Sequence, residues 1–331
     1  MDIKTFRNSP LSHYVVTALT HAAMAQSEWK TILKVCEPSN AVRDLLTLSE
    51  IRYHSMYMGS TCAFDDALVA LYVNKKTDSI SKDIHVLQEC ILYAKHKISE
   101  TKVLTAADLI KINEAISTSD TKILEAENPQ DLPLGLVNDI WGILHDLYNP
   151  AKQYPLLLEV AIAVYRLSTL QQKWGFDLWV FCVLLETLYT ESFEMFGISL
   201  QWLILVDPEK SLCDYDIDHA IVLLFSIFEN IWRYNSNTYL AVIDEERKIC
   251  ETIQELLPKI CTDKVLVAIT KNIYLNNTSF RDNTGVSHGT AVNYLKELER
   301  IGVLSSIVNG RERLYFNKAI CDFALEQWQV M

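Results

Sequence analysis

Polar and basic side chains recur at helical spacing between residues 287 and 300, near the end of the sequence. On one face of a helix, polar side chains can hydrogen-bond to base edges, and cations can contact phosphates. This segment therefore has the chemistry to contact double-stranded DNA. The candidate contact residues are Ser287, His288, Thr290, Asn293, Lys296, Arg300, Arg311 and Arg313.

A helix must present these side chains, and its limits can be predicted. Ser287 is a suitable N-cap because its hydroxyl can accept a hydrogen bond from the first turn, and Gly302 can end the helix in a left-handed conformation. Apolar residues recur at helical spacing and predict a buried stripe. The stripe consists of Ala291, Tyr294, Leu295, Leu298 and Ile301.

A hairpin is predicted directly after this helix. The segments 303–308 and 311–316 flank Asn309-Gly310, a dipeptide that favours the tight turn of a two-stranded hairpin. A shorter helix is expected before Ser287. The order short helix, turn, second helix and hairpin predicts a winged helix-turn-helix domain at 261–331.

The charge of this domain leaves a second interpretation open. Residues 263–331 contain eight Lys and Arg against seven Asp and Glu, a net charge of +1, whereas dedicated DNA-binding domains are usually more basic. Winged helices also serve as protein-interaction or structural modules. DNA contact and protein contact therefore both remain interpretations of this domain.

The preceding residues, 1–260, are predicted to form a helical domain. The whole chain of 331 residues has only nine glycines and eight prolines, few turn-forming residues for its length. Its fold class is therefore expected to be mainly α, with strands confined to the wing. Two of the expected helices are 216–233 and 238–259. The chain carries a net charge of −12, so its larger part repels phosphate and is better suited to a protein partner or to dimerisation.

Cysteines and acidic clusters give little indication of a metal or cofactor. The eight cysteines are scattered, without a C-x-x-C pair. Asp214, Asp216 and Asp218 alternate ahead of His219, but a turn glycine and a closing glutamate do not follow. We therefore expect no metal site and no bound cofactor. An apolar signal segment and a membrane-spanning run are also missing, so a cytoplasmic location without membrane association is expected.

Four segments resemble the Fic family, in the form that ends in a winged helix. The longest is GVSHGTAVNYLKELERIGVLSSIVNGRERLYFN at 285–317. The others are KTFRNSPL at 4–11, HSMYMGST at 54–61 and YPLLLEVAIAVYRLSTLQ at 154–171. The resemblance implies a Fic-like helical domain before the winged helix. It also implies AMP transfer from ATP to a protein hydroxyl, through a loop written H-P-F-x-D/E-G-N-G-R.

The sequence departs from the family at that loop. Continuing the register of 154–171 puts Gln171 at the position of the general base, and a glutamine amide cannot accept a proton near neutral pH. Gly175 falls at the position of the metal-binding acid, Asp177 lies out of place, and Trp179 replaces the arginine. The inhibitory motif of the family is also changed, with His54 and Met58 ahead of Gly59.

These observations predict a Fic-like protein without catalytic residues that regulates transcription by binding DNA through its winged helix. The helical domain would supply dimerisation or sensing. Two alternatives remain open: residual AMP transfer through an atypical loop, and a protein-interaction role without DNA binding.

Overall fold

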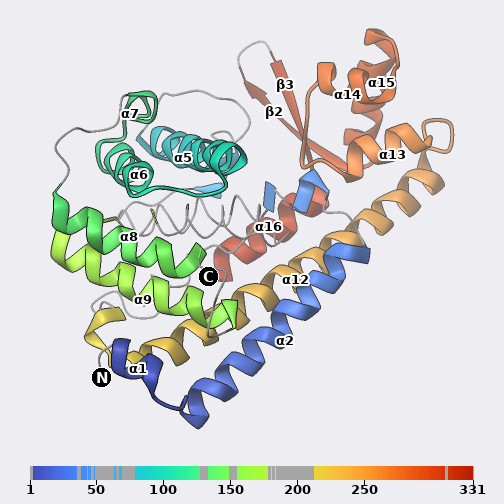
Figure 1. Cartoon of the computed structure of the whole chain (residues 1–331). Coiled ribbons are helices and arrows are strands. Elements are labelled where there is room, and N and C mark those ends of the chain that lie inside the picture. Colours follow the sequence, from blue (N-terminus) through green and yellow to red (C-terminus); the bar gives the residue numbers. More distant parts are fainter. Residues whose placement is uncertain are drawn as a thin grey trace. The chain divides into compact units, whose positions relative to one another are not determined.

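The computed structural model describes residues 3–35, 39–42, 44–45, 48, 63–64, 67–68, 79–126, 133–148, 155–177, 180, 183, 212–309 and 312–330. These residues form a mainly α-helical protein with one small antiparallel sheet near the C-terminus (Figure 1). The mainly α fold with a small wing, predicted from the sequence, is confirmed.

The chain divides into two compact units. Unit 1 comprises residues 1–31 and 75–234, and unit 2 comprises residues 32–74 and 235–331. The boundary falls within two helices, α2 (His13–Val35) and α12 (Ile217–Leu256). The sequence-based division at residue 260 remains a prediction about domains.

Unit 1 is helical throughout its described part. Its other elements are α1 (Ile3–Asn8), α5 (Ser79–Thr101), α6 (Ala106–Thr118), α7 (Lys122–Glu125), α8 (Leu134–Tyr148), α9 (Leu156–Trp174) and the 3-10 helix η1 (Leu212–Asp214). Helices α8 and α9 pack against each other, and α6 contacts α5, α7 and α8. Helix α9 is buried on most sides, as its run of Leu, Val, Ile and Ala residues requires.

A single helix, α12, replaces the two helices expected at 216–233 and 238–259. The residues between them, 234–237, have weak helix propensity but include neither glycine nor proline. Asn235 and Ser236 are buried, as are Trp232 and Tyr239 on either side. Tertiary packing therefore outweighs local propensity, and the helix continues without a break.

The elements that follow α12 include the short helix, the second helix and the hairpin that were predicted, and also β1, a strand outside the predicted wing. These elements are α13 (Asp263–Thr270), β1 (Tyr274–Leu275), α14 (Asn277–Thr284), α15 (His288–Arg300), β2 (Leu304–Asn309), β3 (Glu312–Asn317) and α16 (Lys318–Val330). The sheet has the order β1-β3-β2, with both pairings antiparallel. Three helices followed by a hairpin, with a short strand completing the sheet, form the winged-helix arrangement.

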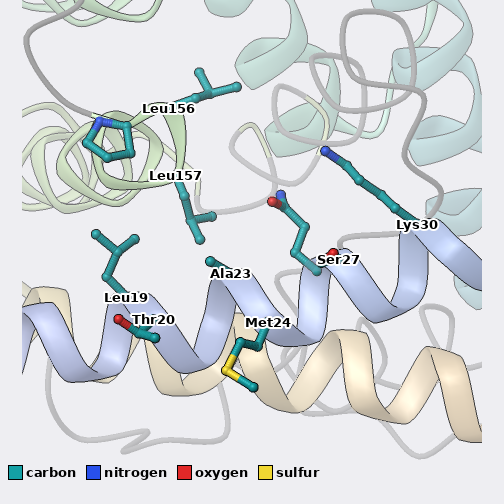
Figure 2. A pocket seen from close by; sticks show the side chains of 10 residues that line it. Leu19, Thr20, Ala23, Met24, Ser27, Lys30, Leu156 and Leu157 are labelled. Atoms are coloured by element: carbon teal, nitrogen blue, oxygen red, sulfur yellow. The ribbon is translucent and has the colours of Figure 1, made fainter.

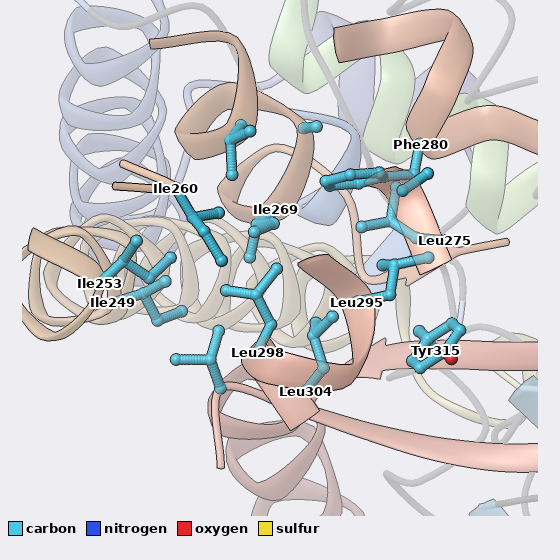
Figure 3. Close-up of a cluster of buried hydrophobic side chains, with 14 residues drawn as sticks. Ile249, Ile253, Ile260, Ile269, Leu275, Phe280, Leu295, Leu298, Leu304 and Tyr315 are labelled. Atoms are coloured by element: carbon cyan, nitrogen blue, oxygen red, sulfur yellow. The ribbon is translucent and has the colours of Figure 1, made fainter. Parts of the chain in front are cut away.

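One core holds these elements together (Figure 3). Phe280 of α14, Leu295 and Leu298 of α15, and Leu304 of β2 are buried in it. Ile249 and Ile253 from the end of α12 join the same cluster. Burying apolar side chains of this size contributes about 1.5–3 kcal/mol each, which explains how short helices and a small sheet are held in place.

The register of the hairpin differs by one residue from the prediction. Asn309 pairs with Glu312. Strands β2 and β3 both begin one residue later than expected. The start of β2 is limited by the end of α15, where Gly302 has φ +81°. There the Gly302 N–H donates to the Glu299 carbonyl at 3.0 Å, and the Val303 N–H donates to the Leu298 carbonyl at 3.0 Å. This pair of bonds is a Schellman motif, which occupies Val303 as part of the helix cap.

Candidate functional site

The turn between α14 and α15 is fixed at both ends. Helix α14 ends at Gly285, whose φ of +76° is the left-handed conformation that glycine adopts at low cost. Helix α15 begins after Ser287, whose hydroxyl accepts a hydrogen bond from the Thr290 N–H at 3.3 Å. The N-cap predicted from the sequence is therefore present, and it sets the direction in which α15 leaves the turn.

Helix α15 has a sharply divided surface. Ala291, Leu295 and Leu298 are fully buried, while Tyr294 and Ile301 pack partly buried against the same core. The predicted stripe is thus confirmed. On the other side, the side chains of His288, Asn293, Lys296 and Arg300 are exposed, and Thr290 is half-buried. One rigid helix therefore presents most of the predicted contact residues to solvent.

Two of the candidate cations are held by carboxylates of the same helix. Arg300 Nη2 lies 2.8 Å from Glu297 Oε2, one turn away on α15. Arg313 Nη2, on β3, lies 3.7 Å from Glu299 Oε1. These pairings were not predicted from the sequence, although the spacing of Glu297 and Arg300 along a helix is a signal that could have indicated the first.

The wing is connected to α15 through Glu299. The hydroxyl of Ser306 on β2 donates to Glu299 Oε1 at 2.6 Å, and Arg313 approaches the same oxygen. The Arg313 guanidinium also lies 6.0 Å from the centre of the Tyr315 ring, within range of a cation–π contact. Arg313 therefore stands at the junction of helix and hairpin. Arg311, the other candidate cation of the wing, lies outside the described residues.

Lys296 differs from these arginines. Within the described part of the chain, its ammonium group has no ion-pair or hydrogen-bond partner, and the side chain is exposed. Among the ten residues from Ser287 to Lys296, none is acidic. The part of α15 up to Lys296 thus presents an uncompensated positive charge beside neutral polar groups.

The segment that resembles the Fic loop begins at the end of α9. Gln171 provides a backbone carbonyl that accepts from the Gly175 N–H at 3.0 Å, and Gly175 has φ +68°. Its neighbour Trp174 donates from Nε1 to Asp139 Oδ2 at 3.1 Å. The backbone N–H of Asp177 donates to Asn113 Oδ1 at 2.7 Å. Trp179 lies outside the described residues, as do His54, Met58 and Gly59 of the changed inhibitory motif.

The carboxylate of Asp139 lies near this segment and accepts hydrogen bonds from two of its side chains. The Lys173 ammonium lies 2.8 Å from Asp139 Oδ2, and this hydrogen bond, with that from Trp174, lowers the pKa of the carboxyl. Asp139 is therefore ionised near neutral pH and is engaged in holding the end of α9. The acidic cluster after α9 has similar structural roles: Asp214 accepts from Gln172, and Asp216 accepts from the His219 N–H.

A pocket in unit 1 lies away from this segment. It has a volume of about 610 Å³ and is lined by α2 and by the start of α9 (Figure 2). Leu19, Ala23, Met24, Leu156 and Leu157 give it apolar walls, and Ser27 and Lys30 lie at its polar end. None of its lining residues belongs to 171–179, so it is separate from the loop resemblance.

The comparisons concern the C-terminal part of the chain. Residues 246–320 match the family model described as "Protein adenylyltransferase SoFic-like, C-terminal domain". The match begins within α12, covers the winged-helix elements and ends in α16. It therefore supports a resemblance to the Fic family over this part of the chain, and it does not extend to residues 171–179.

Two further findings complete the comparison. A search of curated proteins finds no match to the chain. Among the described helices, none is long and apolar enough to cross a membrane.

Proposed function

We propose that this protein binds double-stranded DNA through α15 and the β2–β3 hairpin, and that it acts as a regulator of transcription. The observation that carries the proposal is the exposed face formed by His288, Asn293 and Lys296 on a helix buried along its opposite side. In winged helix-turn-helix proteins, the second helix of the motif enters the major groove. Amide and imidazole groups can meet base edges there, while a lysine meets phosphate.

The pairing of the arginines limits the affinity that we propose. Arg300 and Arg313 must exchange Glu297 and Glu299 for phosphate oxygens, so part of the electrostatic gain is offset. Lys296 has no carboxylate partner within the described residues, so it gives up no ion pair when it contacts phosphate. We therefore expect Lys296 to supply a larger share of the binding free energy than either arginine, and we expect the affinity to depend strongly on salt.

We further propose that residues 171–179 do not support AMP transfer. Gln171 has no basic group, and the Asp177 N–H is engaged by Asn113 rather than free to meet a phosphate. The name of the matched family refers to adenylyltransferases, but the match covers residues 246–320 only. Incubation of the full chain with α-labelled ATP, Mg²⁺ and a cell lysate should therefore give no labelled protein. Labelling that Gln171→Ala or Asp177→Ala removes would contradict this part of the proposal.

DNA binding is tested by fluorescence anisotropy with the full chain and random-sequence duplex DNA. We expect binding that weakens steeply as salt rises, because each phosphate contact releases counterions. Lys296→Ala should weaken binding and reduce the salt slope by about 1. The matched control is Lys264→Ala, which removes an equally exposed lysine from the first turn of α13.

The outcomes separate DNA contact from protein contact. Equal losses in Lys296→Ala and Lys264→Ala would mean a general charge effect without an interface on α15. Absence of binding at low salt would leave the winged helix as a protein-interaction module, the second interpretation that its charge of +1 allows. Dimerisation, a protein partner of the acidic helical part and a cytoplasmic location remain further parts of the proposal. Sedimentation and co-purification experiments test them.

A further inference from the structure

A second pocket in unit 1 is lined mainly by charged side chains. It has a volume of about 440 Å³, within the range of small-ligand sites, and it lies where α1 meets α8 and α9. Its lining residues are Ile3, Lys4, Arg7, Asn8, Asp146 and Arg166. Three of the six are cations, in a chain whose overall charge is −12.

Two arginines share one carboxylate at this pocket. Arg166 Nη1 lies 2.6 Å from Asp146 Oδ2, and Arg7 Nη2 lies 3.3 Å from the same oxygen. Arg7 Nη2 also lies 2.7 Å from Oε2 of Glu159, whose side chain is only 3% exposed. These ion pairs fix both guanidinium groups at the wall of the pocket, although residues 7 and 166 are far apart in the sequence.

The described charges of this cluster do not balance. Lys4, Arg7, Arg166 and Lys173 contribute four positive charges, while Asp146, Glu159 and Asp139, which acts on Arg166 and is paired with Lys173, contribute three negative charges. Burial lowers the pKa of Arg166; the charge of Asp146 opposes this effect, and the charge of Arg7 adds to it. An additional anion would therefore be attracted to the cluster, and it would relieve the repulsion between the two guanidinium groups.

Arg166, on α9, also has N–H groups that can donate to a ligand. Its hydrogen bonds within the described part of the chain, to Asp146 and to the Gly142 carbonyl at 3.1 Å, both use Nη1. A guanidinium has five N–H donors, so Nε and Nη2 remain for a ligand. Glycine at position 142 gives this group room, since a Cβ there would lie 2.9 Å from Arg166 Nη2.

From this geometry we propose that the pocket binds the phosphate group of a small phosphorylated ligand. Arg166 can form paired hydrogen bonds from Nε and Nη2 to phosphate oxygens, which match the planar fork of a guanidinium, and Arg7 adds a second positive charge beside it. Lys4, exposed at the rim on α1, supplies a third positive charge. The site would give the helical part of the protein a ligand to sense, a role independent of the DNA-binding proposal.

Isothermal titration calorimetry of the full chain with inorganic phosphate tests the site. Sodium chloride keeps the ionic strength constant, so that general screening does not contribute. We expect saturable binding by the wild-type protein. Lys4→Glu should weaken it at least about tenfold, because a positive charge at the rim is replaced by a negative one. Lys122→Glu, the same change at an exposed lysine of α7, should bind phosphate as the wild type does.

Arg166→Lys provides a second variant that keeps the charge and the ion pair to Asp146. It should also weaken phosphate binding about tenfold, because an ammonium group cannot form two parallel hydrogen bonds. Equal binding by the wild type, Lys4→Glu and Arg166→Lys would overturn the site. Heat that never saturates would mean an adventitious ion only, and it would overturn the site as well.

Discussion

Glu299 on α15 and Arg313 on β3 approach to 3.7 Å, so the helix and the hairpin are joined by an ion pair at the surface proposed to bind DNA. The same glutamate oxygen accepts a hydrogen bond from Ser306. The pair therefore restrains the hairpin and, at the same time, neutralises a cation that could contact phosphate.

Removing the charge of Glu299 should strengthen DNA binding. In Glu299→Gln the amide still accepts from Ser306, but it no longer neutralises Arg313. We expect a several-fold lower dissociation constant at low salt, and a steeper salt dependence by up to about 1. Anisotropy titrations measure both quantities. Glu326→Gln on α16, an equally charged change at an exposed position, serves as the control and should have a smaller effect. Equal gains in the two variants would contradict a specific role for Glu299.

Two helix caps should separate stability from DNA contact. Asn276 accepts from the Ser279 N–H at 2.7 Å and caps α14, while Ser287 caps α15 at the proposed interface. Replacing either by alanine should lower the free energy of unfolding by about 1 kcal/mol. Only Ser287→Ala should also weaken DNA binding, since α15 carries the contact residues. Urea denaturation and anisotropy on both variants provide the comparison, and equal DNA affinities would place the interface elsewhere.

Two glycines near α15 should respond to alanine with opposite signs. Gly289 lies in the first turn of the helix with open space around a Cβ, so Gly289→Ala should stabilise by about 0.5–1 kcal/mol. Gly302 has φ +81°, and Gly302→Ala should destabilise by about 1–2 kcal/mol through backbone strain alone. Urea denaturation measures both changes. A gain in stability from Gly302→Ala would contradict the described helix end.

Cys90 should make the stability of unit 1 depend on pH in the alkaline range. Burial raises the pKa of its thiol to about 12, whereas an exposed cysteine has a pKa of about 8.5. Above the unfolded pKa, the unfolded chain loses a proton that the folded chain retains, so stability falls as pH rises from about 9 toward 12. Cys90→Ala should show a shallower decline when unfolding free energies are compared at pH 8 and pH 10. If the unfolding free energies of the wild type and of Cys90→Ala decline equally with pH, burial does not keep the Cys90 thiol protonated.

Much of unit 2 could be predicted because its signals are local. Ser287 and Gly302 limit α15 through hydrogen bonds within a few residues, and the buried stripe follows from helical spacing alone. A winged helix-turn-helix therefore follows from the sequence in its correct order. The two strands of the hairpin nevertheless begin one residue later than local signals predict. Two local signals, the cap at the end of α15 and the Asn309-Gly310 dipeptide, lie within seven residues of each other. Only the folded chain shows at which residue each strand begins.

Contacts between distant residues were decided by the tertiary structure. Helix α12 passes unbroken through Asn235 and Ser236, because burial of the surrounding side chains outweighs their weak propensity. Arg7 meets Glu159 across 152 residues of sequence, and Arg313 meets Glu299 across a hairpin. The sequence by itself determined which side chains α15 exposes, because helical periodicity is a property of the backbone. Which of those charges are free and which are paired depends on elements that only folding brings together.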